Sequence, residues 1–166
     1  MSHEEPIHAS GLSGLVIRKM TEDDLEQVVA IDQVSFSLPW PARSFKFELT
    51  DNETSRSWVA VLDGQIAAMI VSWLLVDELH VATIATHPDF RGKGIGRRLL
   101  THALLDAKAE GATRSILEVR ASNEAALKMY RSFGYVEEGR RKDYYKDNNE
   151  DAILMSLDEL HQLSGE

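Results

Sequence analysis

The chain has 166 residues, 43% of them hydrophobic and 27% charged, which is the composition of one folded domain rather than of a disordered chain. It has no cysteine, which excludes disulfides, thiolate zinc sites and an acyl-cysteine intermediate. The net charge of −9 argues against direct nucleic-acid binding, which needs a basic face, and favours cationic partners such as free amines or basic peptide tails.

The first 14 residues are polar and lack the basic start and apolar middle of a signal peptide. We therefore expect a flexible tail over residues 1–14 and a single domain over residues 15–160. The most apolar run, residues 66–76, is too short for a membrane helix, which needs about 20 residues. We expect a core strand there, no membrane contact, a cytoplasmic location, and a monomer or weak dimer.

The first half of the chain predicts two helices among four strands. Thr21 caps the first helix and three acidic residues follow it, where the helix dipole favours negative charge. A short second helix follows the break at residues 39–41, Pro-Trp-Pro. Asp63-Gly64 is a strong signal for a two-residue hairpin turn. The strands are expected at residues 15–20, 57–62, 65–76 and 78–86.

The second half alternates helices with strands. Helical periodicity begins at Gly94 and closes near Gly111, and Asn123 caps a further helix that ends at Gly134. Strands are expected at residues 115–120, 135–140 and 152–157, with a polar connection between the last two. A run of strands followed by strand–helix–strand units predicts an α/β protein of the mixed α+β type, with helices on both faces of a mixed sheet.

A basic, glycine-rich loop separates the strand at residues 78–86 from the next helix. Residues 91–98, Arg-Gly-Lys-Gly-Ile-Gly-Arg-Arg, hold four of the chain's 18 basic residues. Glycines let backbone N–H groups approach a ligand, and a helix N-terminus attracts anions, so the loop predicts a pyrophosphate site. The alternative is a simple strand-to-helix turn. Walker and dinucleotide-binding loops fit poorly, because Gly-Lys-Ser/Thr is absent and Arg97 replaces the third glycine.

Two motifs carry a resemblance to a known family. Arg91, Gly94 and Gly96 match the Q/R-x-x-G-x-G/A signature of the GNAT superfamily of N-acetyltransferases. Residues 117–123, Leu-Glu-Val-Arg-Ala-Ser-Asn, with Tyr130 and the Phe-Gly-Tyr that follows, resemble the RimI-type group of that superfamily. The resemblance extends over about residues 15–157. The strand with His80 instead resembles archaeal and eukaryotic protein N-terminal acetyltransferases.

The resemblance implies a GNAT fold with a central, mostly antiparallel sheet of six to seven strands. It implies acetyl-CoA as co-substrate, without a metal; none of the six histidines has metal-ligand spacing. The implied contacts to acetyl-CoA come from a strand end, the basic loop and a helix cap: Ile84, Ala85, Thr86, Arg91, Gly92, Lys93, Gly94, Ile95, Gly96, Arg97 and Asn123.

Glu118 is implied as the general base and Tyr130 as the general acid. Without the resemblance, Glu118 would be read as a solvated acid paired with Arg120, and Tyr130 as a core aromatic residue. Asn123 would be a helix cap alone. Trp40, Tyr144 and Tyr145 are read as loop residues that either cap the core or, as the resemblance implies, flank the peptide substrate.

The implied function is direct transfer of acetyl, in a ternary complex, to a protein's N-terminal α-amine. The specific case is the N-terminal alanine of a ribosomal protein, as in RimI-type enzymes. Two alternatives stay open. One is a GNAT enzyme that acetylates a small-molecule amine or a lysine side chain, and the other is a non-catalytic acyl-CoA-binding module.

Overall fold

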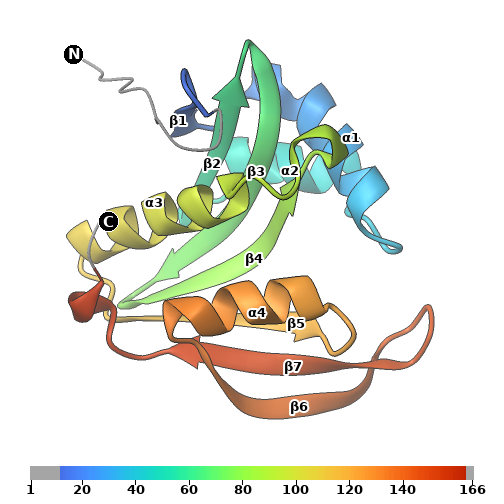
Figure 1. Ribbon diagram of the computed structural model, residues 1–166, viewed down its shortest axis with the longest axis vertical. Helices are drawn as coiled ribbons and strands as arrows, with labels where there is room; N and C mark the ends of the chain where they lie inside the picture. Colours follow the sequence, from blue (N-terminus) through green and yellow to red (C-terminus); the bar gives the residue numbers. More distant parts are fainter. Residues whose placement is uncertain (1–11, 164–166) are drawn as a thin grey trace. The chain divides into compact units, whose positions relative to one another are not determined.

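The structure is a computed structural model that describes residues 12–163, apart from the side chain of His161. The described chain packs into two compact units (Figure 1). Residues 12–71 and 83–103 form the first unit, and residues 72–82 and 104–163 form the second. Three elements run through both: β3 (Gln65–Leu75), β4 (Glu78–Thr86) and α3 (Ile95–Ala109).

Seven strands form one sheet in the order β1-β2-β3-β4-β5-β7-β6. β1 (Val16–Lys19) is antiparallel to β2 (Ser55–Leu62), and β4 is parallel to β5 (Arg114–Arg120). β7 (Glu150–Leu157) lies between β5 and β6 (Val136–Tyr145) and is antiparallel to both. The prediction of a mixed, mostly antiparallel sheet is confirmed.

The first unit places helices on both sides of its strands. α2 (Ala42–Thr50) passes behind β2 and β3 in Figure 1, and the start of α3 passes in front of them. A capping box at Thr21 opens the short 3-10 turn Glu22–Asp24, which leads into α1 (Leu25–Ser35). The predicted hairpin turn is present, with φ of 53° at Asp63 and 77° at Gly64. The unit's core is apolar and includes Val28, Ile31, Phe45, Val59, Ile70, Leu99 and Leu100.

The second unit contains α4 (Glu124–Phe133) beside the strands β5, β7 and β6. Asn123 caps α4 as predicted, because its side-chain oxygen accepts the N–H of Ala126 at 3.2 Å. Gly134 ends α4 with φ 107°, the left-handed conformation expected there. Two further short 3-10 turns are Pro88–Phe90, between β4 and α3 in the first unit, and Leu160–Gln162, after β7 in the second.

The last two strands are longer than predicted, which corrects the reading of two aromatic residues. β6 continues past Arg140 to Tyr145, and β7 begins at Glu150, so Tyr144 and Tyr145 lie in a strand and not in a loop. β6 is an edge strand whose residues are almost all exposed. The strand therefore lacks the alternation of polar and apolar residues by which a strand is recognised in a sequence, and its charged residues give no strand signal past Arg140.

The start of the chain is described only in part. Most of the tail expected over residues 1–14 lies outside the described residues. Residues 12–14 form a turn in which Leu12 is buried and its carbonyl accepts the N–H of Leu15 at 3.0 Å. In the part of the chain from residue 12 to residue 163, no helix is long and apolar enough to span a bilayer.

Candidate active site

The loop between β4 and α3 is shaped by its glycines. Gly92 and Gly94 have φ of 78° and 83°, values that other residues rarely adopt. A Cβ built on either glycine would meet no atom within 4 Å, so a ligand can approach this backbone closely. A Cβ on Gly96 would instead lie 3.2 Å from Thr86 Oγ1. The small size of Gly96 therefore lets α3 begin against the end of β4.

Helix α3 begins where this loop ends. The carbonyl of Gly94 accepts the N–H of Arg98 at 3.1 Å, so the N–H groups of residues 95–97 precede the first intrahelical bond. The helix dipole adds partial positive charge there, and the side chains of Lys93, Arg97 and Arg98 are exposed nearby. This combination suits an anionic group such as the pyrophosphate of acetyl-CoA.

The side chain of Arg91 folds back onto the first unit. Its Nε donates to the carbonyl of Thr86 at 2.9 Å, and its Nη2 donates to Ser35 Oγ at 3.2 Å. These bonds join the loop to the end of β4, where Ile84 and Ala85 also lie, and to the last residue of α1. Arg91 therefore fixes the position of the loop.

Trp40 lies in the connection between α1 and α2, with its ring 5.1 Å from that of Phe45. Its backbone N–H donates to Asp32 Oδ2 at 2.7 Å. Asp32 is buried, and its other carboxyl oxygen has no partner among residues 12–163. Burial raises the pKa of Asp32, because the charged form is poorly solvated. Burial of this carboxyl group costs folding free energy, and the hydrogen bond between Asp32 and the Trp40 backbone holds the connection in place.

Glu118 lies on β5, where buried Leu117 and Val119 flank it and leave its own side chain exposed. Its Oε2 accepts a hydrogen bond from Arg141 Nε at 2.5 Å. Arg141 belongs to β6, so its side chain reaches past β7 to make this ion pair. The pairing of Glu118 with Arg120 that local sequence suggests does not form, because Arg120 contacts Asp147 and Glu150 instead.

Tyr130 is buried on α4, and its ring meets that of Tyr135 edge-on at 5.6 Å. Burial, with a smaller contribution from Tyr145, raises the pKa of Tyr130 above its ordinary value. Its phenol therefore stays protonated at neutral pH. Tyr135 is buried as well, but its hydroxyl is bonded to Ser115 Oγ at 2.8 Å.

A bulge in β6 sets the positions of the paired tyrosines. Arg141 pairs with Ala152 and Tyr145 pairs with Glu150, so residues 142–144 of β6 lie opposite Asp151 alone. Asp143 has φ 51° within this bulge, and its N–H donates to Asp151 Oδ1 at 3.1 Å. Bulges are common beside active sites because they redirect side chains. Here the bulge leaves Tyr144 exposed and Tyr145 half-buried.

The two units divide the predicted site residues between them. The first unit contains Trp40 and the predicted cofactor residues from Ile84 to Arg97, and the second contains Glu118, Asn123, Tyr130, Tyr144 and Tyr145. Sequence reasoning missed Asp32 and Arg141, and the partner that it gave Arg120 as the alternative to the resemblance, Glu118, is not the partner observed. All three depend on contacts between elements, for which the sequence carries no local signal.

Comparison with known proteins defines the class. Residues 25–135 match the acetyltransferase (GNAT) family, and the chain belongs to this family. It is 34% identical over 143 residues to the [ribosomal protein bS18]-alanine N-acetyltransferase of Escherichia coli (strain K12), covering 85% of this chain and 95% of that protein. It is also 34% identical over 158 residues to the N-alpha-acetyltransferase RimI of Mycobacterium tuberculosis, covering 93% and 94%.

A comparison with solved structures leads to the same class of protein. The crystal structure of the ribosomal-protein-S18-alanine N-acetyltransferase from Escherichia coli superposes with a TM-score of 0.82 at 32% identity. The match covers 92% of this chain and 97% of that one. The predicted GNAT fold is therefore confirmed over nearly the full length.

Proposed function

We propose that this chain acetylates the N-terminal α-amine of a protein, with the N-terminal alanine of ribosomal protein bS18 as its substrate. As a member of the GNAT family the chain is an acetyltransferase, and acetyl-CoA is its acetyl donor. The observation that carries the finer proposal is the similarity to the Escherichia coli enzyme, which covers 85% of this chain and 95% of that protein.

Acetyl-CoA binding is assigned to the loop of the first unit, and the contact from Asn123 stays a prediction from the family resemblance. The backbone N–H groups of residues 92–97 would hold the pyrophosphate, supported by the positive φ of Gly92 and Gly94 and by the N-terminus of α3. Ile84, Ala85 and Thr86 lie beyond the Glu78–Val81 stretch of β4 that pairs with β5. We assign their backbone to the pantetheine arm, which carries amide groups that can pair with a strand.

The chemistry needs a neutral amine and a protonated leaving group. An α-amine has a pKa near 8, so a carboxylate such as Glu118, directly or through a water, suffices to take its proton. The amine nitrogen then bonds to the acetyl carbon as the carbon–sulfur bond breaks. Tyr130 gives its phenolic proton to the departing sulfur, and the proton that the nitrogen loses as the amide forms restores the phenol through solvent. Glu118 accepts the amine proton in competition with Arg141, whose Nε donates to Glu118 Oε2 at 2.5 Å.

The transfer is direct, because the chain has no cysteine to carry an acetyl group. We assign Trp40, Tyr144 and Tyr145 to contacts with the peptide, since they lie on the α1–α2 connection and beside the β6 bulge. We further propose that the enzyme works in the cytoplasm as a monomer or weak dimer, without binding nucleic acid directly.

A substrate panel tests this proposal. The enzyme is incubated with acetyl-CoA and with peptides that begin with alanine, serine, glycine or methionine, and products are identified by mass. Two further arms are an N-terminally blocked peptide with a free lysine and a small-molecule diamine. We expect acetylation at the α-amine of alanine peptides. Preferred acetylation of lysine or of the diamine would contradict the proposal, and binding without turnover would indicate an acyl-CoA-binding module.

A further inference from the structure

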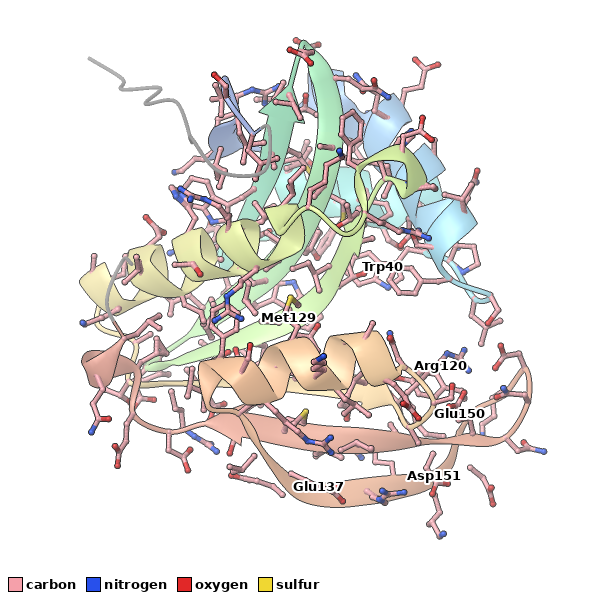
Figure 2. The ribbon with its side chains drawn as sticks, viewed as in Figure 1. Trp40, Arg120, Met129, Glu137, Glu150 and Asp151 are labelled. Atoms are coloured by element: carbon pink, nitrogen blue, oxygen red, sulfur yellow. The ribbon has the colours of Figure 1, made fainter. Side chains whose placement is uncertain are left out.

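Arg120, the last residue of β5, is surrounded by groups from the β6–β7 hairpin. Its Nη2 donates to both carboxyl oxygens of Asp147 at 3.1 Å, and its Nη1 donates to Asn148 Oδ1 and to Glu150 Oε1, each at 3.3 Å. The guanidinium carbon lies 4.0 Å from the centre of the Tyr145 ring. Figure 2 shows Arg120 and Glu150 side by side at this end of β5.

Glu150 extends the contact to the turn before α4. One carboxyl oxygen accepts from Arg120, and the other accepts the backbone N–H of Ser122 at 2.5 Å. The bonds from Ser122, more than any other influence, hold the pKa of Glu150 below its ordinary value. The carboxylate is therefore ionised at neutral pH and holds both partners. Arg120 and Glu150 thus join β5, the β5–α4 turn and the hairpin.

The hairpin tip is polar, and apart from its bonds to Arg120 it is held by short-range bonds such as those between Asn148 and Glu150. Residues 146–149, Lys-Asp-Asn-Asn, are all exposed and include no apolar side chain. Segments of this kind open locally at little cost, because few buried contacts hold them. The planar guanidinium of Arg120 offers bonds in fixed directions and a flat face for the Tyr145 ring. Arg120 therefore fixes the conformation of the hairpin tip and the position of the Tyr145 ring.

We propose that Arg120 is a positioning residue for the peptide substrate. Through Asp147, Glu150 and the ring of Tyr145 it fixes the hairpin in the conformation that receives the peptide. This inference rests on the proposed function, because it requires a peptide to bind beside Tyr145. It assigns Arg120 no contact with acetyl-CoA and no part in proton transfer.

Arg114 provides a matched control at the opposite end of the same strand. It is the first residue of β5 and donates to three carboxylates, Glu78, Asp158 and Glu138, at 2.6, 3.0 and 3.3 Å, where Arg120 donates to two carboxylates and one amide. Arg114→Lys and Arg120→Lys each keep one positive charge and lose the forked bonds of guanidinium. If these clusters serve stability alone, the two substitutions should have the same consequences.

The test compares both variants with the wild type by steady-state kinetics on an alanine peptide, acetyl-CoA titration and amide exchange. For Arg120→Lys we expect the peptide KM to rise about tenfold, as loss of a charged hydrogen bond implies, with kcat and acetyl-CoA affinity nearly unchanged. Exchange at residues 144–149 should accelerate. Arg114→Lys should leave the peptide KM unchanged. In thermal unfolding, the two substitutions should lower the melting temperature by similar amounts.

The outcomes separate this inference from the function on which it rests. An active wild type with an unchanged peptide KM in Arg120→Lys would overturn the role of Arg120 alone. Equal rises in KM for both arginine variants would make the cluster structural and would also overturn it. A wild type that binds acetyl-CoA but acetylates no peptide would contradict the proposed function, and the role of Arg120 would fall with it.

Discussion

The β4–α3 loop follows a strand and the end of β5 is the last part of one, yet different chemical groups define the two regions. The loop uses backbone geometry: glycines at positive φ and the N-terminus of a helix. The end of β5 uses charged side chains, with Glu118 paired to Arg141 and Arg120 paired to Asp147 and Glu150. Changes in the loop should therefore abolish binding of acetyl-CoA, whereas changes at β5 should alter rates and peptide binding.

The largest effect is expected at Gly94. Gly94→Val forces a β-branched residue to φ 83° and places its side chain in the space from which a ligand approaches the loop. Gly111→Val is the control, because Gly111 also has a positive φ and open surroundings but lies past the end of α3. Calorimetric titration should show no acetyl-CoA binding by folded Gly94→Val and normal binding by folded Gly111→Val. Normal affinity in Gly94→Val would refute the loop assignment.

The next largest effect is expected at Glu118. Glu118→Gln keeps the shape and removes the base, and such groups typically contribute about 10²–10⁴-fold to the rate. The loss should be greatest below pH 8, where the α-amine is protonated, and should shrink as the pH rises and the amine deprotonates without help. A pH–rate profile on an alanine peptide measures this. Activity near that of the wild type at every pH would remove Glu118 from the mechanism.

Tyr130 can be tested against its neighbour in the core. Tyr130→Phe removes the hydroxyl that we assign to the departing sulfur, so turnover should fall by about 10²-fold or more while acetyl-CoA still binds. Tyr135→Phe removes a hydroxyl that is bonded to Ser115, which should cost about 1 kcal/mol of stability and little rate. Single-turnover rates and thermal unfolding of both variants separate the two roles. Similar rates for the two variants would show that Tyr130 is a core residue only.

How far the sequence predicts each region follows from the same contrast. The loop could be found because glycine spacing, basic residues and the strand-to-helix change lie within about a dozen residues. The elements were predictable where apolar periodicity or caps mark them, as at Asn123 and Gly134. β6 was cut short because an exposed edge strand has no alternation to show. Glu118 and Arg141 lie 23 residues apart, and only the sheet order β5-β7-β6 brings them together.

The smallest effect is expected at Arg141, and it tests whether the charge pairs at β5 restrain the base. Arg141 holds Glu118 at 2.5 Å, where it competes with the incoming α-ammonium for the same carboxylate. Arg141→Gln should therefore raise kcat/KM for the peptide, chiefly through a lower KM. Both partners are partly exposed, with 55% and 31% of their side-chain surface accessible. Exposed pairs are worth at most about 1 kcal/mol, so the gain should not exceed about fivefold.

Arg140→Gln is the matched control, because Arg140 is the adjacent residue of β6 and pairs with Glu137 and Asp151 instead of Glu118. It should leave kcat/KM unchanged. Salt sharpens the comparison: screening weakens the Arg141–Glu118 pair in the wild type, so the advantage of Arg141→Gln should shrink between 0.05 and 0.5 M salt. A tenfold loss of activity in Arg141→Gln would reverse the interpretation. Arg141 would then bind the substrate or orient Glu118 during transfer, and the ion pair would be part of the active arrangement rather than a competitor of the amine.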